Sequence, residues 1–478
     1  MLRSRDAGRS IVLWRRLWKE CRYLAKRQLA AFELSTAAFF GEAEACLQRE
    51  RCSARRPGSV TGGTFPMKTV GIIAEYNPFH NGHAWQLAKA KELTGADYAV
   101  VVMSGNFVQR GLPAVMDKSL RAEAALLCGA DAVIELPVHY SAASAEYFAS
   151  GAAALLDRLG VVDFLCFGSE CGDIGVLSNL ADTLLTEDKS FKRLLKERLK
   201  EGASYPQART DALHMLSPKP EQPLSLLKSP NNILAVEYLK ALKKRNSLMI
   251  PYTVKRTGSG YHDKTLDGPY CSALAVREAI SGKNGIRSVK AQIPAAAYEL
   301  MERAFQNSFP LLPEDFSVPL SYKLVLEQEK DFSVYFDIDS GLSDRLHKFL
   351  PAYADFSSFC EKVKTKNLTY TRVSRALLHI LLNIYQADMD IFRAEDYVYY
   401  GRILGFRKTA SPLMAAMKKN ASLPLISRPA EAKRRIQSEN GMRMFLQDIQ
   451  AGHIYALAAE HKYHRGFRTE YEKQIIVL

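Results

Sequence analysis

The feature that most constrains the fold of this chain is an alternation, from Lys68 onward, of short apolar segments with segments of helical character. The apolar segments predict strands over Thr69–Glu75, Tyr98–Ser104, Ala132–Glu135, Phe164–Gly168 and Leu248–Val254. The segments of helical character predict helices from about Gly82 to Leu93 and over Lys118–Cys128, Ser144–Arg158 and Ala273–Ile280. Continuously apolar strands separated by helices are typical of parallel sheets covered on both faces. The sequence therefore predicts an α/β fold with a doubly wound parallel sheet.

The pattern changes near residue 285, where strand signals become rare and helical segments with polar loops follow. Amphipathic helices are predicted over Tyr370–Tyr385, Pro412–Lys419 and Pro429–Ser438. We therefore expect an α/β catalytic domain over 67–285 and a mostly helical domain over 286–478.

Residues 1–66 have a different composition from the rest. They carry 13 Lys and Arg against 6 Asp and Glu. This excess of 7 positive charges is half of the net charge of +14 of the whole chain. A targeting segment, a basic RNA-binding arm and an upstream extension of the reading frame ahead of Met67 each fit such a segment. We favour the extension and expect residues 1–66 to be poorly ordered, with one helix around Trp14–Phe40.

The composition of the whole chain is that of a globular protein, with 47% hydrophobic and 24% charged residues. No apolar run in the sequence reaches the roughly 20 residues that a membrane span requires. The eight cysteines form no CxxC pair and match no zinc-binding spacing. We predict a cytoplasmic protein without membrane contact or tightly bound metal, and the sequence leaves its oligomeric state open.

One segment carries a clear chemical signal, GIIAEYNPFHNGH at Gly71–His83. It reads as a strand, a polar turn and the start of a helix. Gly82 has no Cβ where a phosphate must approach the backbone, and a helix N-terminus attracts anions. His80 and His83 can flank one phosphate and stabilise the charge that develops as pyrophosphate leaves. A surface position or a metal site are the alternatives for two histidines at this spacing, but no third metal ligand lies nearby in the sequence.

This segment resembles the His-x-Gly-His signature of the nucleotidyltransferase superfamily. More narrowly, it resembles the family of bacterial tRNA(Met) cytidine acetate ligases. Further matching blocks are MSGNFVQRG at Met103–Gly111, FGSE at Phe167–Glu170, SPNNIL at Ser229–Leu234, KRTGSGYHD at Lys255–Asp263, SALAVR at Ser272–Arg277, TRVSR at Thr371–Arg375 and GRILGF at Gly401–Phe406. The resemblance extends from Met67 nearly to the end of the chain.

The resemblance implies a Rossmann-like nucleotidyltransferase domain and an ATP-dependent ligase. Such enzymes form acetyl-adenylate from acetate and ATP, with Mg²⁺ and without acetyl-CoA. They transfer the acetyl group to N4 of the wobble cytidine of elongator tRNA(Met), which gives N4-acetylcytidine. It also implies catalytic roles for His80 and His83, and ATP binding by Ile73, Ala74, Glu75, Tyr76, Asn77, Pro78, Phe79, His80, Asn81, Gly82, His83, Gly168, Asn231, Arg256 and Thr257.

Several of these residues also have plain structural explanations. Gly168 fits an ordinary turn after a strand, and Asn231 fits a helix N-cap. Arg256 fits a solvated surface turn. Ser272 and Arg277 resemble a second phosphate-binding signature, although Ser272 also fits an N-cap.

Polar residues after the second strand are candidates for the acetate pocket or the RNA path, namely Asn106, Gln109, Arg110 and Lys118. Glu75 and Asp117 are candidates to support Mg²⁺ on ATP, or structural carboxylates.

Basic clusters interleaved with aromatic residues in the C-terminal half favour contact with the tRNA anticodon. The residues that we single out are Arg372, Arg375, Arg407 and Lys408. A solvated helix face is the alternative for any one cluster.

Two other functions remain open. An adenylyl- or cytidylyltransferase acting on a phosphorylated metabolite would need no RNA, and a non-catalytic RNA-binding protein would not need His80.

Overall fold

The computed structural model describes residues 67–478 apart from 186–188, 204–206, 209–210, 213–214, 216–225, 228, 257–265, 267, 269, 307, 465 and 467. The predictions for residues 1–66 and for Thr257 fall outside the described residues. The described part forms one compact unit.

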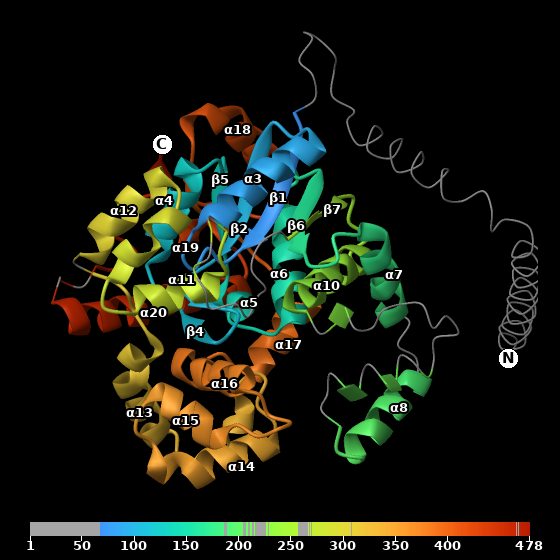
Figure 1. Ribbon diagram of the computed structural model, residues 1–478, viewed down its shortest axis with the longest axis vertical. Helices are drawn as coiled ribbons and strands as arrows, with labels where there is room; N and C mark the ends of the chain where they lie inside the picture. The colour runs from blue at the N-terminus through green and yellow to red at the C-terminus, as the bar shows by residue number, and fades with distance from the viewer. Residues whose placement is uncertain are drawn as a thin grey trace, which may run out of the picture. The chain divides into compact units, whose positions relative to one another are not determined.

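A mostly parallel sheet forms the centre of the molecule, with strand order β10-β8-β5-β2-β1-β6-β7 and with β9 beside β8 (Figure 1). Its strands are β1 (Thr69–Ala74), β2 (Tyr98–Ser104), β5 (Ala132–Leu136), β6 (Phe164–Ser169), β7 (Ile250–Lys255), β8 (Gly401–Phe406), β9 (Leu425–Ile426) and β10 (Ile476–Val477). From β1 the chain adds β2 and β5 on one side, then crosses to add β6 and β7 on the other. The direction of winding therefore reverses between β1 and β6, and open sheets bind ligands at such a point.

Helices cover both faces of this sheet, as the uninterrupted apolar strands require. Val100, Val101 and Val102 of β2 have no exposed surface. The connecting helices are α3 (Asn81–Thr94), α4 (Lys118–Leu127), α6 (Ala145–Arg158), α7 (Ile174–Leu185), α8 (Lys189–Lys200), α10 (Pro230–Lys244) and α11 (Ala273–Ile280). Helix α3 packs on β1 and β7, whereas α6 packs on β2 and β5 and against α10. The fold class predicted from the sequence is confirmed.

The C-terminal part is largely helical but contributes to the same sheet. Its helices are α12 (Ala295–Phe305), α13 (Ser317–Leu326), α14 (Ser340–Phe349), α15 (Phe356–Val363), α16 (Tyr370–Leu382), α17 (Gln386–Ala394), α18 (Ser411–Asn420), α19 (Ala432–Arg435) and α20 (Glu439–Tyr463). Strand β8 pairs antiparallel with β5, and β10 pairs with β8. The sequence predicted a mostly helical domain here and did not mark the segment GRILGF, which forms β8, as a strand. The helix expected over Pro429–Ser438 is a short 3-10 turn, Pro429–Glu431, followed by α19.

A two-stranded hairpin connects the sheet to the C-terminal helices. Strands β3 (Phe107–Val108) and β4 (Leu112–Pro113) pair with each other directly after β2. At the tip of the hairpin, the carbonyl of Gly111 accepts a hydrogen bond of 2.8 Å from the Ser374 hydroxyl of α16. One small element therefore lies between the carboxyl ends of the strands and the TRVSR segment.

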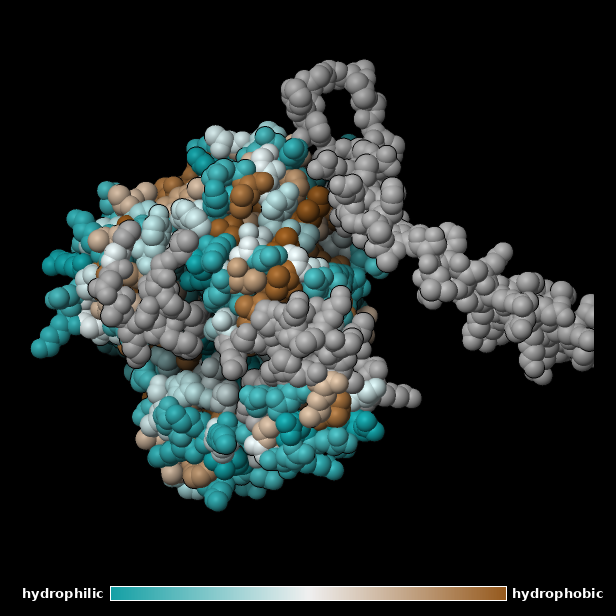
Figure 2. Space-filling view, turned by 45° about the vertical axis from the view of Figure 1, so that its right-hand side comes forward, coloured by the Kyte–Doolittle hydropathy of each residue, from teal (hydrophilic) through white to brown (hydrophobic). Residues whose placement is uncertain are grey.

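Figure 2 shows hydrophilic side chains over most of the lower part of this face and hydrophobic ones in separate patches. Within the described residues, no helix is both long and apolar enough to cross a membrane.

Candidate active site

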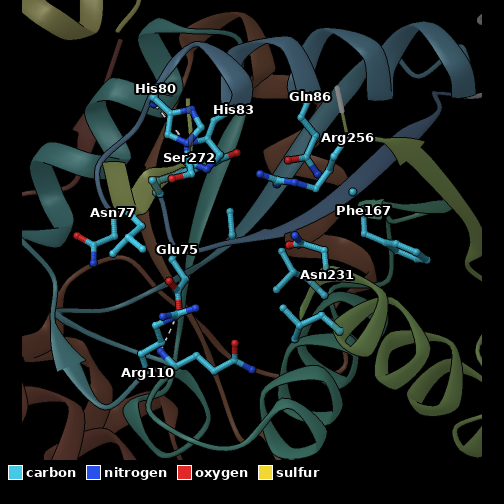
Figure 3. Close-up of a pocket in the computed structure, with 18 of the residues that line it drawn as sticks. Glu75, Asn77, His80, His83, Gln86, Arg110, Phe167, Asn231, Arg256 and Ser272 are labelled. Atoms are coloured by element: carbon cyan, nitrogen blue, oxygen red, sulfur yellow. Dashed lines mark hydrogen bonds between the residues drawn. The ribbon is translucent and has the colours of Figure 1, made fainter. Parts of the chain in front are cut away.

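A pocket lies at the carboxyl ends of β1, β6 and β7, at the point where the sheet reverses its winding (Figure 3). It collects most of the residues singled out from the sequence. Those that line it are Ile73, Ala74, Glu75, Tyr76, Asn77, His80, His83, Gln109, Arg110, Gly168, Asn231, Arg256, Ser272 and Arg277. Gly82 lines an adjoining pocket that shares His80 and His83 with the first. Phe79 is buried against Tyr76 and His83, and the Asn81 side chain donates to Ala291 O.

His80 and His83 are fixed by the first turn of α3. His80 is the N-cap residue, and its Nδ1 accepts a hydrogen bond of 3.1 Å from the backbone N–H of Gly82. The Nδ1 of His83 accepts in turn from the backbone N–H of His80 at 3.3 Å. The two rings stack with their centroids 3.7 Å apart. The histidines thus cap the helix reciprocally, as the two side chains of a capping box do.

This arrangement defines the protonation state of both rings. A nitrogen that accepts a backbone N–H must carry a lone pair, so each neutral ring bears its proton on Nε2. Burial, followed by the positive charges of Arg256 and Arg277, lowers the pKa of His80 from an ordinary 6.5 to about 3. Burial and the neighbouring His80 also hold the pKa of His83 well below its ordinary value. Both residues are therefore neutral N–H donors at physiological pH.

The N-terminus of α10 meets the pocket through Asn231. The carboxylate of Glu170 accepts from the Asn231 side-chain amide at 2.7 Å and from the Asn232 backbone N–H at 2.9 Å. Asn232 is fully buried and accepts from the backbone N–H of Cys171. Neither asparagine is the N-cap, which is Ser229. Glu170 therefore holds Asn231 in place at the wall of the pocket.

Two arginines and a serine approach the histidines from neighbouring elements. The backbone N–H of Arg256 bonds to Ser169 O, and a Cβ on Gly168 would contact the Arg256 side chain at 3.4 Å. Ser272 caps α11 by accepting from Ala275 N at 3.0 Å. Arg277 donates to the carbonyl of Asn77 at 2.7 Å, which ties α11 to the turn after β1.

The polar residues after β2 divide into two groups. Gln109 and Arg110 line the pocket, and the backbone N–H of Gln109 donates to the Glu75 carboxylate at 2.8 Å. Lys118 lies elsewhere, because it is buried between Glu135 at 2.7 Å and Glu470 at 2.9 Å. Asn106 is also buried and accepts from Lys118 N, so neither side chain lines the pocket, where a role in binding acetate would place it.

Asp117 is also structural. It caps α4 by accepting from Ser119 N at 2.8 Å, and it pairs with Lys473 at 2.7 Å. Its candidate role in supporting Mg²⁺ is therefore not supported by its position. Among the described residues there is no group of three or more His, Cys, Asp and Glu side chains that could hold a metal ion.

Several apolar pocket residues were not singled out from the sequence, although Phe167 and Leu234 lie within the matching blocks FGSE and SPNNIL. Phe148 of α6, Phe167 of β6, and Leu234 and Tyr238 of α10 form much of its apolar wall. They belong to helices and strands in which the sequence pattern predicts every apolar residue to lie in the hydrophobic core. Only the packing of α6 against α10 shows which of them face the pocket.

The proposed RNA contacts lie outside this pocket and differ in exposure. The Arg375 side chain is only 14% exposed and pairs with Asp337, and Arg372 pairs with Asp339 at 2.8 Å. Arg407 is 42% exposed, and Lys408 next to it is exposed as well. Tyr400, one of the aromatic residues interleaved with these basic clusters, is buried and donates to Asp448, so it cannot stack on a base.

Comparison with known proteins shows the family of the chain. The family model for HIGH Nucleotidyl Transferase matches residues 67–470. A tRNA(Met) cytidine acetate ligase of Caldanaerobacter subterraneus is 42% identical over 393 residues, which are 82% of this chain and 96% of that protein. The chain belongs to the tRNA(Met) cytidine acetate ligase family within the HIGH nucleotidyltransferases. A second member, from Acetivibrio thermocellus, is 36% identical over 86% of this chain and its own full length.

Solved structures agree with this family assignment. Thermotoga maritima TmcAL without ligand superposes with a TM-score of 0.81 at 32% identity, over 86% of this chain and all of that one. The same protein bound with alpha-thio ATP gives a TM-score of 0.79 at 31% identity. The resemblance inferred from the sequence motifs is thereby confirmed.

Proposed function

We propose that this protein is a tRNA(Met) cytidine acetate ligase that works in two steps. It joins acetate to ATP, which gives acetyl-adenylate and pyrophosphate. It then transfers the acetyl group to N4 of the wobble cytidine of elongator tRNA(Met). Relatives that share 36–42% identity over most of the chain carry this name, and a structural neighbour binds an ATP analogue.

The arrangement of His80 and His83 is the observation that carries the first step. Their Nε2–H groups are the remaining donors once each Nδ1 has accepted a backbone N–H. They stand at the N-terminus of α3, whose dipole favours an anion. Donors and cations aimed at one phosphate stabilise the charge that develops in the transition state. We assign the α-phosphate of ATP to this position, with Arg256 and Arg277 beside it.

The other predicted contacts follow from the same placement. Gly168 leaves room for the nucleoside next to β6, and Asn231 offers a fixed amide. Mg²⁺ arrives with ATP as part of the substrate. Free acetate replaces acetyl-CoA, and the reaction takes place in the cytoplasm.

The test of the first step is acetate-dependent exchange of pyrophosphate into ATP by the full chain. His80→Asn removes the Nε2–H donor but keeps a good N-cap. We expect exchange to fall about 10²- to 10³-fold, the usual loss for one transition-state donor. The control is His461→Asn, an exposed histidine of α20 that lies outside the pocket.

Two results would contradict the proposal. Exchange that needs a phosphorylated metabolite instead of acetate would indicate a different nucleotidyltransferase. Normal acetylation of tRNA by the His80→Asn variant would show that the histidine pair does not serve catalysis.

A further inference from the structure

A second pocket adjoins the first and shares four residues with it, Glu75, Asn77, Arg110 and Arg277. Its other walls are largely apolar and come from the β3–β4 hairpin, the end of α11 and the chain before α13. They comprise Val108, Leu112, Pro113, Val115, Glu278, Ser281, Leu311, Leu312 and Pro313. Apolar walls of this kind suit the faces of a flat ring, and the four polar residues shared with the first pocket suit its polar edges.

The second step of the reaction needs a group that accepts a proton, because the attacking amine loses one as it becomes an amide. The histidines are unsuited to this, since the Nδ1 of each already accepts a backbone N–H. Burial raises the pKa of Tyr76 and Tyr238, so both phenols hold their protons. Among the described residues that line the first pocket, Glu75 is the one with a carboxylate side chain, and a carboxylate can accept this proton.

Glu75 is held in a fixed position at the junction of the two pockets. Its Oε1 accepts from the backbone N–H of Gln109 at 2.8 Å, in the hairpin that also carries Arg110. Its backbone carbonyl accepts from the buried guanidinium of Arg121 at 2.6 Å. In Figure 3, Glu75 lies between the histidines at one end of the pocket and Arg110 at the other.

We propose that the second pocket receives the acceptor cytosine base and that Glu75 accepts the proton of its attacking amine. This inference rests on the proposed function and goes beyond it, because it assigns the acceptor site and the base. Carboxylates accept from the N4 amine of cytosine, and arginine suits the acceptor atoms of a base. Uracil would present an oxygen to Glu75, so the same contact selects cytosine. The apolar walls fit the ring of a base taken out of its stack.

The amine nitrogen forms a bond to the carbonyl carbon of acetyl-adenylate, and the bond from that carbon to the phosphate oxygen breaks. AMP leaves with the electron pair of the broken bond. The proton lost by the nitrogen passes to Glu75, which releases it to solvent before the next turnover.

The main test compares the two half-reactions in a single variant. In Glu75→Gln the amide oxygen still accepts the Gln109 N–H, but the side chain no longer accepts a proton. We expect single-turnover transfer of labelled acetyl to tRNA to fall about 10²- to 10⁴-fold, the usual contribution of a general base. Acetate-dependent pyrophosphate exchange should fall by a much smaller factor, and Glu75→Asp should recover part of the transfer.

The matched variant is Glu278→Gln, which alters the other carboxylate of the second pocket. Its loss of transfer should be much smaller than that of Glu75→Gln. Equal losses in both half-reactions of Glu75→Gln would show that Glu75 serves ATP, and normal transfer would place the base elsewhere. Absence of exchange in the wild-type protein would overturn the proposed function itself.

A second experiment tests the pocket. Ser281 is an exposed residue at its edge, and Ser281→Trp would fill the space of the base. We expect the KM for tRNA to rise at least tenfold, whereas Asn179→Trp on the exposed face of α7 should leave it unchanged. An unchanged KM in Ser281→Trp would overturn the assignment of the pocket.

Discussion

Neutral, buried His80 makes the stability of the folded chain depend on pH. Its pKa is about 3 when folded against an ordinary 6.5 when unfolded. Between these values only the unfolded state binds the proton, so the free energy of unfolding falls as the pH falls below 6.5. In the wild type it should fall by roughly 1–2 kcal/mol more than in His80→Asn between pH 7 and pH 5. Denaturant titrations at the two pH values measure this, and equal losses would show that His80 is not shielded from solvent.

The placement of the residues in the turn after β1 could be predicted from the sequence because it depends on local structure. His80, Gly82 and His83 lie between the end of β1 and the first turn of α3, and a short sequence motif predicts both of these elements. Lys118 and Asp117 were misjudged for the opposite reason. Their partners Glu470 and Lys473 lie more than 350 residues away, so the sequence does not show that these charges are neutralised in the interior.

At the scale of elements, the contact of the β3–β4 hairpin with α16 depends on Gly111. Its φ of 72° lies in the left-handed region, and a Cβ there would overlap with the backbone nitrogen of Arg375. We expect Gly111→Ala to lower the free energy of unfolding by more than about 2 kcal/mol, since the left-handed conformation alone costs about 1–2 kcal/mol. Gly95→Ala is the control, because Gly95 has a φ of 60° and open space around it. Comparable losses for both variants would show that the hairpin does not pack closely on α16.

The elements that could be predicted are those with a periodic pattern. Strand β2 and helix α11 have the bounds that the apolar pattern indicated. Strand β8 was missed because its short segment contains Arg402 and two glycines. Arg402 is tolerated in a buried strand only because Glu135 and Glu470 surround it. Gly405 is required because a Cβ would meet Ile476 of β10 at 2.8 Å. Both reasons lie in distant parts of the chain.

At the scale of the whole molecule, a buried ionic cluster joins the end of the chain to the central sheet. Glu470 is fully buried and pairs with Lys118 at 2.9 Å, Arg402 at 2.7 Å and Lys473 at 2.9 Å. Glu470→Gln leaves one positive charge in the interior without compensation. Breaking a buried pair costs about 3–5 kcal/mol, and we expect a loss in that range by denaturant titration. Glu92→Gln at the exposed pair with Lys89 should cost less than about 1 kcal/mol. A similarly small effect at Glu470 would mean that solvent reaches the cluster.

Basic residues of the C-terminal part are the proposed contacts to tRNA. Lys408 is exposed, and the Arg407 side chain is 42% exposed although it lies 4.0 Å from the Asp131 carboxylate, whereas the Arg375 side chain is 14% exposed and pairs with Asp337. Arg407 and Lys408 should therefore contribute more than Arg375 to the binding of RNA phosphates. Each phosphate contact adds about 0.7–0.9 to the slope of log affinity against log salt. The variant Arg407→Ala/Lys408→Ala should thus weaken tRNA binding and lower that slope by about 1–2. Lys196→Ala/Lys200→Ala removes the same charge from exposed positions of α8, away from the proposed contacts. If both double variants change the slope equally, the attraction comes from the net charge of the chain and not from an RNA site at residues 407 and 408.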